Sequence, residues 1–131
     1  DLLFFITGED GSLILPPRRI GQVSIPANAL TSRLVDMTWS GSEFAVAWVE
    51  AVSEPEDPDP EKSRINVLRI SRDGSDIAQP FHISSEFLLH TPDIEWSGSA
   101  YGLSWLESPH ESPVMQIKSW FALVGCGPPE D

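Results

Sequence analysis

The chain has 131 residues, of which 40% are hydrophobic, so it is long enough to form one domain with a real core. Twenty acidic residues against eight basic ones give a formal net charge of −12, which argues against binding to nucleic-acid phosphates or to an anionic membrane. No apolar run approaches the roughly 20 residues that span a bilayer. We therefore expect a soluble protein, and the composition leaves open whether it is secreted or sits at a cell surface.

Residues 1–20 predict two strands joined by a tight turn. Apolar and polar residues alternate along this segment, which is the period of a half-buried strand. Asp10-Gly11 marks the turn, because glycine readily takes a positive φ. We interpret this segment as a partial unit that holds the last two strands of a four-stranded sheet.

Residues 33–83 predict one full four-stranded unit. Ser40-Gly41-Ser42 is a hairpin turn between the first two strands, and Asp73-Gly74 turns the chain between the last two. No stretch shows the helical period of about 3.6 residues. The four strands are expected at residues 34–39, 44–50, 65–71 and 77–83.

An acidic, proline-rich loop at residues 50–61 interrupts this unit, with six carboxylates and three prolines. Such composition favours a stiff, solvated excursion. The alternative is a site for a cation or a basic partner on Glu56, Asp57 and Asp59. The prolines hinder the curling that a calcium loop needs, and the Asp-x-Asp-x-Asp-Gly pattern is missing, so we predict no metal site.

Residues 92–123 predict a second partial unit with three strands, followed by a tail at 124–131. The segment 93–107 repeats the pattern of 36–50 at an offset of 57 residues, including two tryptophans, a Ser-Gly-Ser triplet and a final glutamate. An Asp-Gly-Ser triplet also recurs, at residues 10–12 and 73–75. The chain is therefore interpreted as a single repeat domain.

The repeat decides the fold class, which we predict to be all-β. Phe44, Val46 and Trp48 are bulky on one face of their strand, whereas Ala45 and Ala47 are small on the other. Sheets of this kind stack bulky face onto small face, as the blades of a β-propeller do. We predict four-stranded antiparallel blades, about two per chain, with a β-sandwich of about nine strands as the alternative.

The spacing Trp-x-Gly-x-x-Phe/Tyr-x-x-x-Trp, at 39–48 and 96–105, together with Asp73-Gly74, resembles bacterial β-propeller repeats over about residues 2–123. The resemblance implies a fold and no activity. A propeller has about four to eight blades, which two blades cannot supply. We therefore expect either a homo-oligomer or one part of a longer polypeptide.

Asp36 and Asp93 occupy matching positions on the first strand of their units. A structural role is favoured, in which the carboxylate accepts a backbone N–H from the adjoining unit, and ligand binding is the alternative. The tryptophans of the two repeats, at 39, 48, 96 and 105, are expected in the core as two equivalent, buried pairs. Trp120 has no counterpart and is the better candidate for an exposed binding residue.

The long connections, near residues 21–32, 51–63, 84–91 and 107–113, share one end of the predicted sheets, and binding is expected there. No catalytic constellation or cofactor motif is found, and Cys126 stands alone. We therefore predict a non-catalytic module that binds a protein or a glycan. The alternatives are part of a larger secreted hydrolase acting on glycans, with Asp36 and Asp93 as an acid/base pair, and a purely structural segment.

Overall fold

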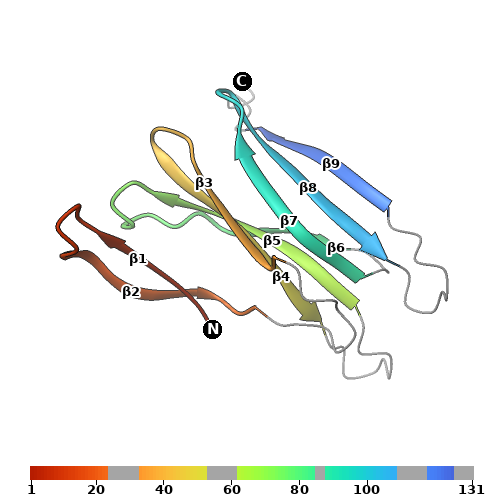
Figure 1. The fold of residues 1–131 in the computed structure, drawn as a ribbon, viewed down its shortest axis with the longest axis horizontal. Helices are drawn as coiled ribbons and strands as arrows, with labels where there is room; N and C mark the ends of the chain where they lie inside the picture. The colour runs from red at the N-terminus through yellow and green to blue at the C-terminus, as the bar shows by residue number, and fades with distance from the viewer. Residues whose placement is uncertain (24–32, 53–61, 85–87, 109–117, 126–131) are drawn as a thin grey trace.

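The computed structural model describes residues 1–23, 33–52, 62–84, 88–108 and 118–125. All regular structure in these residues is β, as predicted, arranged in three open antiparallel sheets (Figure 1). The strands are β1 (Leu2–Thr7), β2 (Leu13–Gly21), β3 (Val35–Trp39), β4 (Glu43–Val52), β5 (Lys62–Ser71), β6 (Phe81–Ser84), β7 (Leu88–Trp96), β8 (Ala100–Ser108) and β9 (Lys118–Gly125).

The three sheets follow one another in chain order. The N-terminal sheet pairs β1 with β2, the central sheet has the order β3-β4-β5-β6, and the C-terminal sheet has the order β7-β8-β9. Every pairing joins strands that are neighbours in the sequence, and Figure 1 shows the central sheet between the other two. Each contact between sheets contains a cluster of buried apolar side chains.

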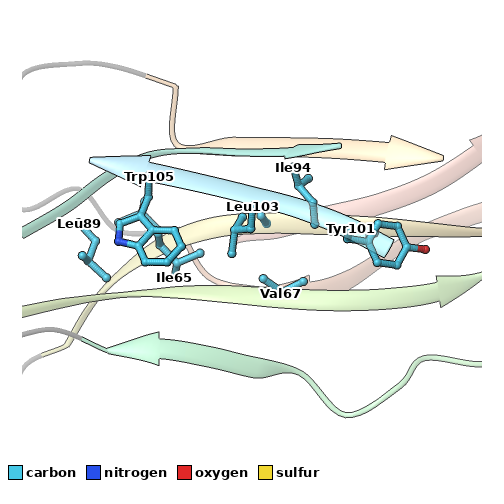
Figure 2. Packing of buried hydrophobic residues seen from close by; sticks show 10 residues of the cluster. Ile65, Val67, Leu89, Ile94, Tyr101, Leu103 and Trp105 are labelled. Atoms are coloured by element: carbon cyan, nitrogen blue, oxygen red, sulfur yellow. The ribbon is translucent and has the colours of Figure 1, made fainter. Parts of the chain in front are cut away.

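The contact between the central and C-terminal sheets joins a small face to a bulky one. Ala45 and Ala47 of β4 are fully buried in the same cluster as Tyr101, Leu103 and Trp105 of β8. Figure 2 shows the side chains of β8 pointing toward Ile65 and Val67 of β5. The alternation in β4 therefore has the packing role that the sequence predicted for it.

The opposite face of the central sheet packs on the N-terminal sheet. Val46 and Trp48 of β4 are buried in one cluster with Phe4 of β1. Phe4 and Phe44 meet edge to face, with ring centroids 5.4 Å apart. Both faces of β4 are thus covered, which explains its apolar sequence.

Two glycines allow the N-terminal sheet to approach the central sheet closely. A side chain on Gly21 would overlap the Trp48 ring, and one on Gly74 would overlap Leu15. Because Gly21 has no side chain, the Trp48 indole N–H donates to the Gln22 carbonyl at 3.1 Å. These two glycine contacts, at 21 and 74, form the close approach between the sheets.

The hairpins β3–β4 and β7–β8 close in the same way. Gly41 has φ 96° and Gly98 has φ 99°, a region that favours glycine. The Ser40 N–H donates to the Glu43 carbonyl at 3.0 Å, and the Ser97 N–H donates to the Ala100 carbonyl at 2.9 Å. Each Ser-Gly-Ser triplet therefore forms the turn that the sequence predicted.

Two strands begin four residues away from their predicted starts. The strand expected from residue 77 begins only at Phe81, and Ile77 forms an isolated bridge with Ile70. Pro80 lies just before Phe81 and has no N–H to donate to a ladder. The strand expected from residue 92 begins earlier, at Leu88, because pairing continues beyond a ladder irregularity between His90 and Asp93.

The predicted burial is confirmed for one of the two tryptophan pairs. Trp48 and Trp105 are both buried, with 3% and 8% of their surface exposed. Burial of Trp39 was predicted wrongly, because 41% of its surface is exposed, and Trp96 is half-buried. The N-terminal sheet has no strand over Trp39 in the described residues, which explains this exposure.

Candidate functional site

Strands β3 and β7 lie beside each other where the central and C-terminal sheets meet. The Ile94 N–H donates to Asp36 Oδ2 at 2.9 Å, and the Trp96 N–H donates to Thr38 Oγ1 at 3.3 Å. Because β7 is an edge strand, these amides have no ladder partner on this side. Asp36 therefore has the structural role favoured by its position in the sequence.

The two aspartates singled out from the sequence come together beside one arginine. Arg33 Nη1 lies 3.9 Å from Asp36 Oδ1 and 4.0 Å from Asp93 Oδ2. A hydrogen bond with the Asp36 carboxyl raises the pKa of Asp93, and desolvation and the nearby negative charges of Asp36 and Glu95 add to the rise, while Arg33 opposes it. A proton is thus held more firmly here than on an isolated aspartate.

A pocket of about 410 Å³ opens next to this cluster. Its volume falls in the range of small-molecule sites, about 300 to 1,000 Å³. The residues come from the chain before β3 and from the middle of β7 and of β8. They are Arg33, Thr91, Pro92, Asp93, Ser104, Trp105 and Leu106.

The wall of the pocket on β7 is locally strained. Thr91 has φ 44°, the left-handed region that a β-branched residue rarely adopts. The β7–β8 ladder shifts register between His90 and Asp93, around Thr91 and Pro92. Such irregularities are common beside functional sites, because they redirect side chains out of a regular strand.

Trp105 contributes a hydrogen-bond donor with no acceptor among the described residues. Its Nε1 is buried and unpaired, whereas the equivalent atom of Trp48 donates to the Gln22 carbonyl. Buried polar atoms are nearly always paired, so an unpaired one needs an explanation. A ligand that carries an acceptor is one explanation for a tryptophan that lines a pocket.

A second polar cluster lies on the face of the central sheet toward the N-terminal sheet. Glu50 Oε2 accepts bonds from Arg64 Nε at 2.9 Å, Arg64 Nη2 at 2.8 Å and Asn66 Nδ2 at 2.9 Å. Burial works to raise the pKa of Glu50, but these bonds outweigh it and leave the pKa below its usual range. Three charge-assisted or amide bonds converge on this one carboxylate oxygen, which favours a structural role for the cluster.

The other predicted binding residues are not brought to the pocket by the described structure. Glu56, Asp57 and Asp59 lie outside the described residues. Trp120 lies on β9, opposite Trp105 in the register, and its side chain is also outside the described part. Whether these four residues bind a ligand remains a prediction.

Sequence reasoning missed Arg33, Thr91 and Ser104. Arg33 is a positive charge three residues before Asp36, and this spacing was a usable signal. The Thr91-Pro92 pair marks a break in a strand, because proline disrupts a ladder. Ser104 resembles many other serines, and the pairing of Asp93 with Ser104 became visible only in the register of the C-terminal sheet.

The described residues contain no group of three or more His, Cys, Asp or Glu side chains that could hold a metal ion. They also contain no helix long and apolar enough to cross a membrane. Comparison with protein-family models, curated proteins and solved structures found no match for this chain.

Proposed function

We propose that this chain is a non-catalytic binding module, built on a propeller-like stack of sheets, whose pocket beside β3 and β7 binds a glycan. The observation that carries the proposal is the pocket of about 410 Å³ lined by Arg33, Asp93, Ser104 and Trp105, a tryptophan whose buried indole N–H is unpaired. Rigid strands hold these groups, and long connections leave the sheets at the same end.

The chemistry of the pocket suits hydroxyl groups, which both donate and accept hydrogen bonds. Asp93 accepts, the Arg33 guanidinium donates, and the Ser104 and Thr91 hydroxyls do either. The strong acidity of the chain does not repel a neutral sugar. A compact, neutral, hydroxyl-rich ligand therefore fits better than an anionic one.

The propeller-like arrangement is supported by the way in which the sheets stack. The central sheet packs its small face on the C-terminal sheet and its bulky face on the N-terminal sheet. In both contacts the sheets stack in the order in which they occur along the chain. A stack that continues in this direction is the arrangement expected of blades.

The glycosidase alternative is less well supported by the same geometry. The two carboxyl groups of a glycosidase stand roughly 5 to 9.5 Å apart, with the glycosidic bond between them. Asp36 instead accepts the Ile94 N–H, and its carboxyl group lies close enough to Asp93 to raise the pKa of Asp93. Asp36 is therefore occupied by structural bonds.

The proposal is tested by screening the chain on a glycan array and measuring the best-bound sugar by titration calorimetry. Arg33→Gln removes the charged guanidinium donor of the pocket and is expected to weaken binding roughly tenfold or more, as for a bond to a charged group. Arg19→Gln is the matched control, because Arg19 pairs with Asp1 on the exposed N-terminal sheet. Absence of sugar binding, or equal affinity of the two variants, would overturn the proposal.

A further inference from the structure

The N-terminal sheet leaves an uncovered corner beside the central sheet. In the described residues, β1 pairs with β2 alone, so its other edge is free. Met37 and Trp39 of β3 are 52% and 41% exposed on the face that packs on the N-terminal sheet elsewhere, whereas Leu3 and Phe5 are exposed on the side of β1 that points away from the central sheet. Phe4 of β1 packs on β4 and β5, in one cluster with Val46 and Leu68, so β1 covers these strands and leaves the same face of β3 uncovered. A free strand edge next to exposed apolar side chains is a typical site of strand addition.

The free edge of β3 also presents backbone donors. The Val49 N–H donates to the Leu34 carbonyl, which places the paired side of β3 at residues 34, 36 and 38. Alternation along the strand then directs the amides of Met37 and Trp39 away from β4. These amides correspond to those of Ile94 and Trp96, which bind side chains of β3.

The same kind of corner is already filled once within the molecule. The hairpin β7–β8 lies against the other face of β3 and β4, where Asp36 and Thr38 bind the edge amides of β7. Tyr101, Leu103 and Trp105 of that hairpin pack on the central sheet. The interface between two sheets is thus established, with one inner strand giving acceptors to the next.

We propose that the corner formed by β1 and the free edge of β3 binds a further β-hairpin of the β7–β8 type. Its inner strand would lie beside β3 with the carboxylate equivalent to Asp93 accepting the N–H of Met37. Its second strand would extend the N-terminal sheet at the edge of β1. The partner is therefore a strand pair with alternating large and small side chains and an acidic residue on its inner strand.

The probe is a synthetic peptide of residues 88–108, which carries β7 and β8 and lacks β9, added to the full chain. A second peptide is closed by a disulfide between cysteines added at its ends. It keeps the hairpin conformation if the linear peptide is unfolded in solution. We expect saturable, micromolar binding by fluorescence anisotropy. Amide hydrogen exchange of Met37 and Trp39 is expected to slow in the complex. Absence of binding by both peptides would overturn the proposal.

Trp39→Lys places a charge in the corner, and Ile14→Lys is the matched control, because Ile14 is 63% exposed on β2. We expect Trp39→Lys to weaken peptide binding at least tenfold and Ile14→Lys to leave it unchanged, with both variants folded by circular dichroism. A peptide with Asp93→Leu should also bind more weakly, since it lacks the acceptor. Equal binding to both protein variants would show that the peptide binds elsewhere and would overturn the proposal.

Discussion

The hairpins β3–β4 and β7–β8 share one sequence pattern and one turn, and they differ in what covers them. Trp39 lies 4.6 Å from Phe44 and Trp96 lies 4.8 Å from Tyr101, measured between ring centroids. The first pair is partly exposed, whereas Tyr101 is fully buried against the central sheet. Local sequence therefore decides the hairpin, and the neighbouring sheet decides its burial.

The largest effect in this comparison is expected from the buried tryptophan of the first hairpin. Trp48→Ala leaves a cavity between the N-terminal and central sheets and should lower the free energy of unfolding by about 3–5 kcal/mol. Trp39→Ala removes a half-exposed ring and should cost much less. Urea denaturation of both variants measures the difference. Equal losses of unfolding free energy would show that the contribution of a tryptophan does not depend on the sheet that covers it.

The matched aspartates should respond in different ways. Asp36→Ala leaves the Ile94 N–H without its acceptor and should cost about 1–3 kcal/mol. The pKa of Asp93 is raised above 3.8 in the folded chain, so its ionisation opposes folding as the pH rises through that range. Asp93→Asn should therefore be at least as stable as the wild type at pH 7.

The advantage of Asp93→Asn should shrink as the pH falls toward 3, where Asp93 is protonated in both folded and unfolded chains. The thermal stability of both aspartate variants is measured between pH 3 and pH 7. A loss of stability in Asp93→Asn as large as that in Asp36→Ala would mean that the two carboxyl groups have the same structural role.

A smaller effect is expected where the second hairpin has a hydroxyl that the first one lacks. The Tyr101 hydroxyl donates to Glu43 Oε1 at 2.8 Å, whereas Phe44 stands at the equivalent position in the first hairpin. Tyr101→Phe should cost about 0.5–1.5 kcal/mol by loss of this bond. Glu43→Gln, which keeps an acceptor, is the control in the same denaturation measurement.

The smallest effect concerns the two Asp-Gly-Ser turns. Bonds from the Ser75 hydroxyl and N–H and from the Ser71 hydroxyl lower the pKa of Asp73 to about 2. The corresponding bonds from Ser12 lower the pKa of Asp10. The stabilisation from Asp73 is present above pH 3.8 and should be lost as the pH falls toward 2. Nuclear magnetic resonance titration of both carboxyl groups checks this, and an ordinary pKa for Asp73 would contradict it.

The all-β class and the hairpin turns could be predicted, because alternation and glycine position are local signals. The exposure of Trp39 could not be predicted, since it depends on how far another sheet extends over β3. The role of Asp36 was predictable from its repeated position, whereas the pocket depends on Arg33 and on the irregularity at Thr91, which bring together three segments of the chain. Contacts between segments that are far apart in the sequence produce no local sequence pattern from which they could be predicted.

The two glycine contacts also bear on how the chain comes apart. Gly21 lies against the Trp48 ring and leaves no room for a methyl group, whereas Gly74 meets the flexible end of Leu15 and has a φ of 73°, so the two contacts resist substitution for different reasons. Alanine at position 21 would push the Trp48 ring and the N-terminal sheet apart and leave the central and C-terminal sheets in contact. Unfolding would then proceed in two stages, with the N-terminal sheet released first and the larger body later.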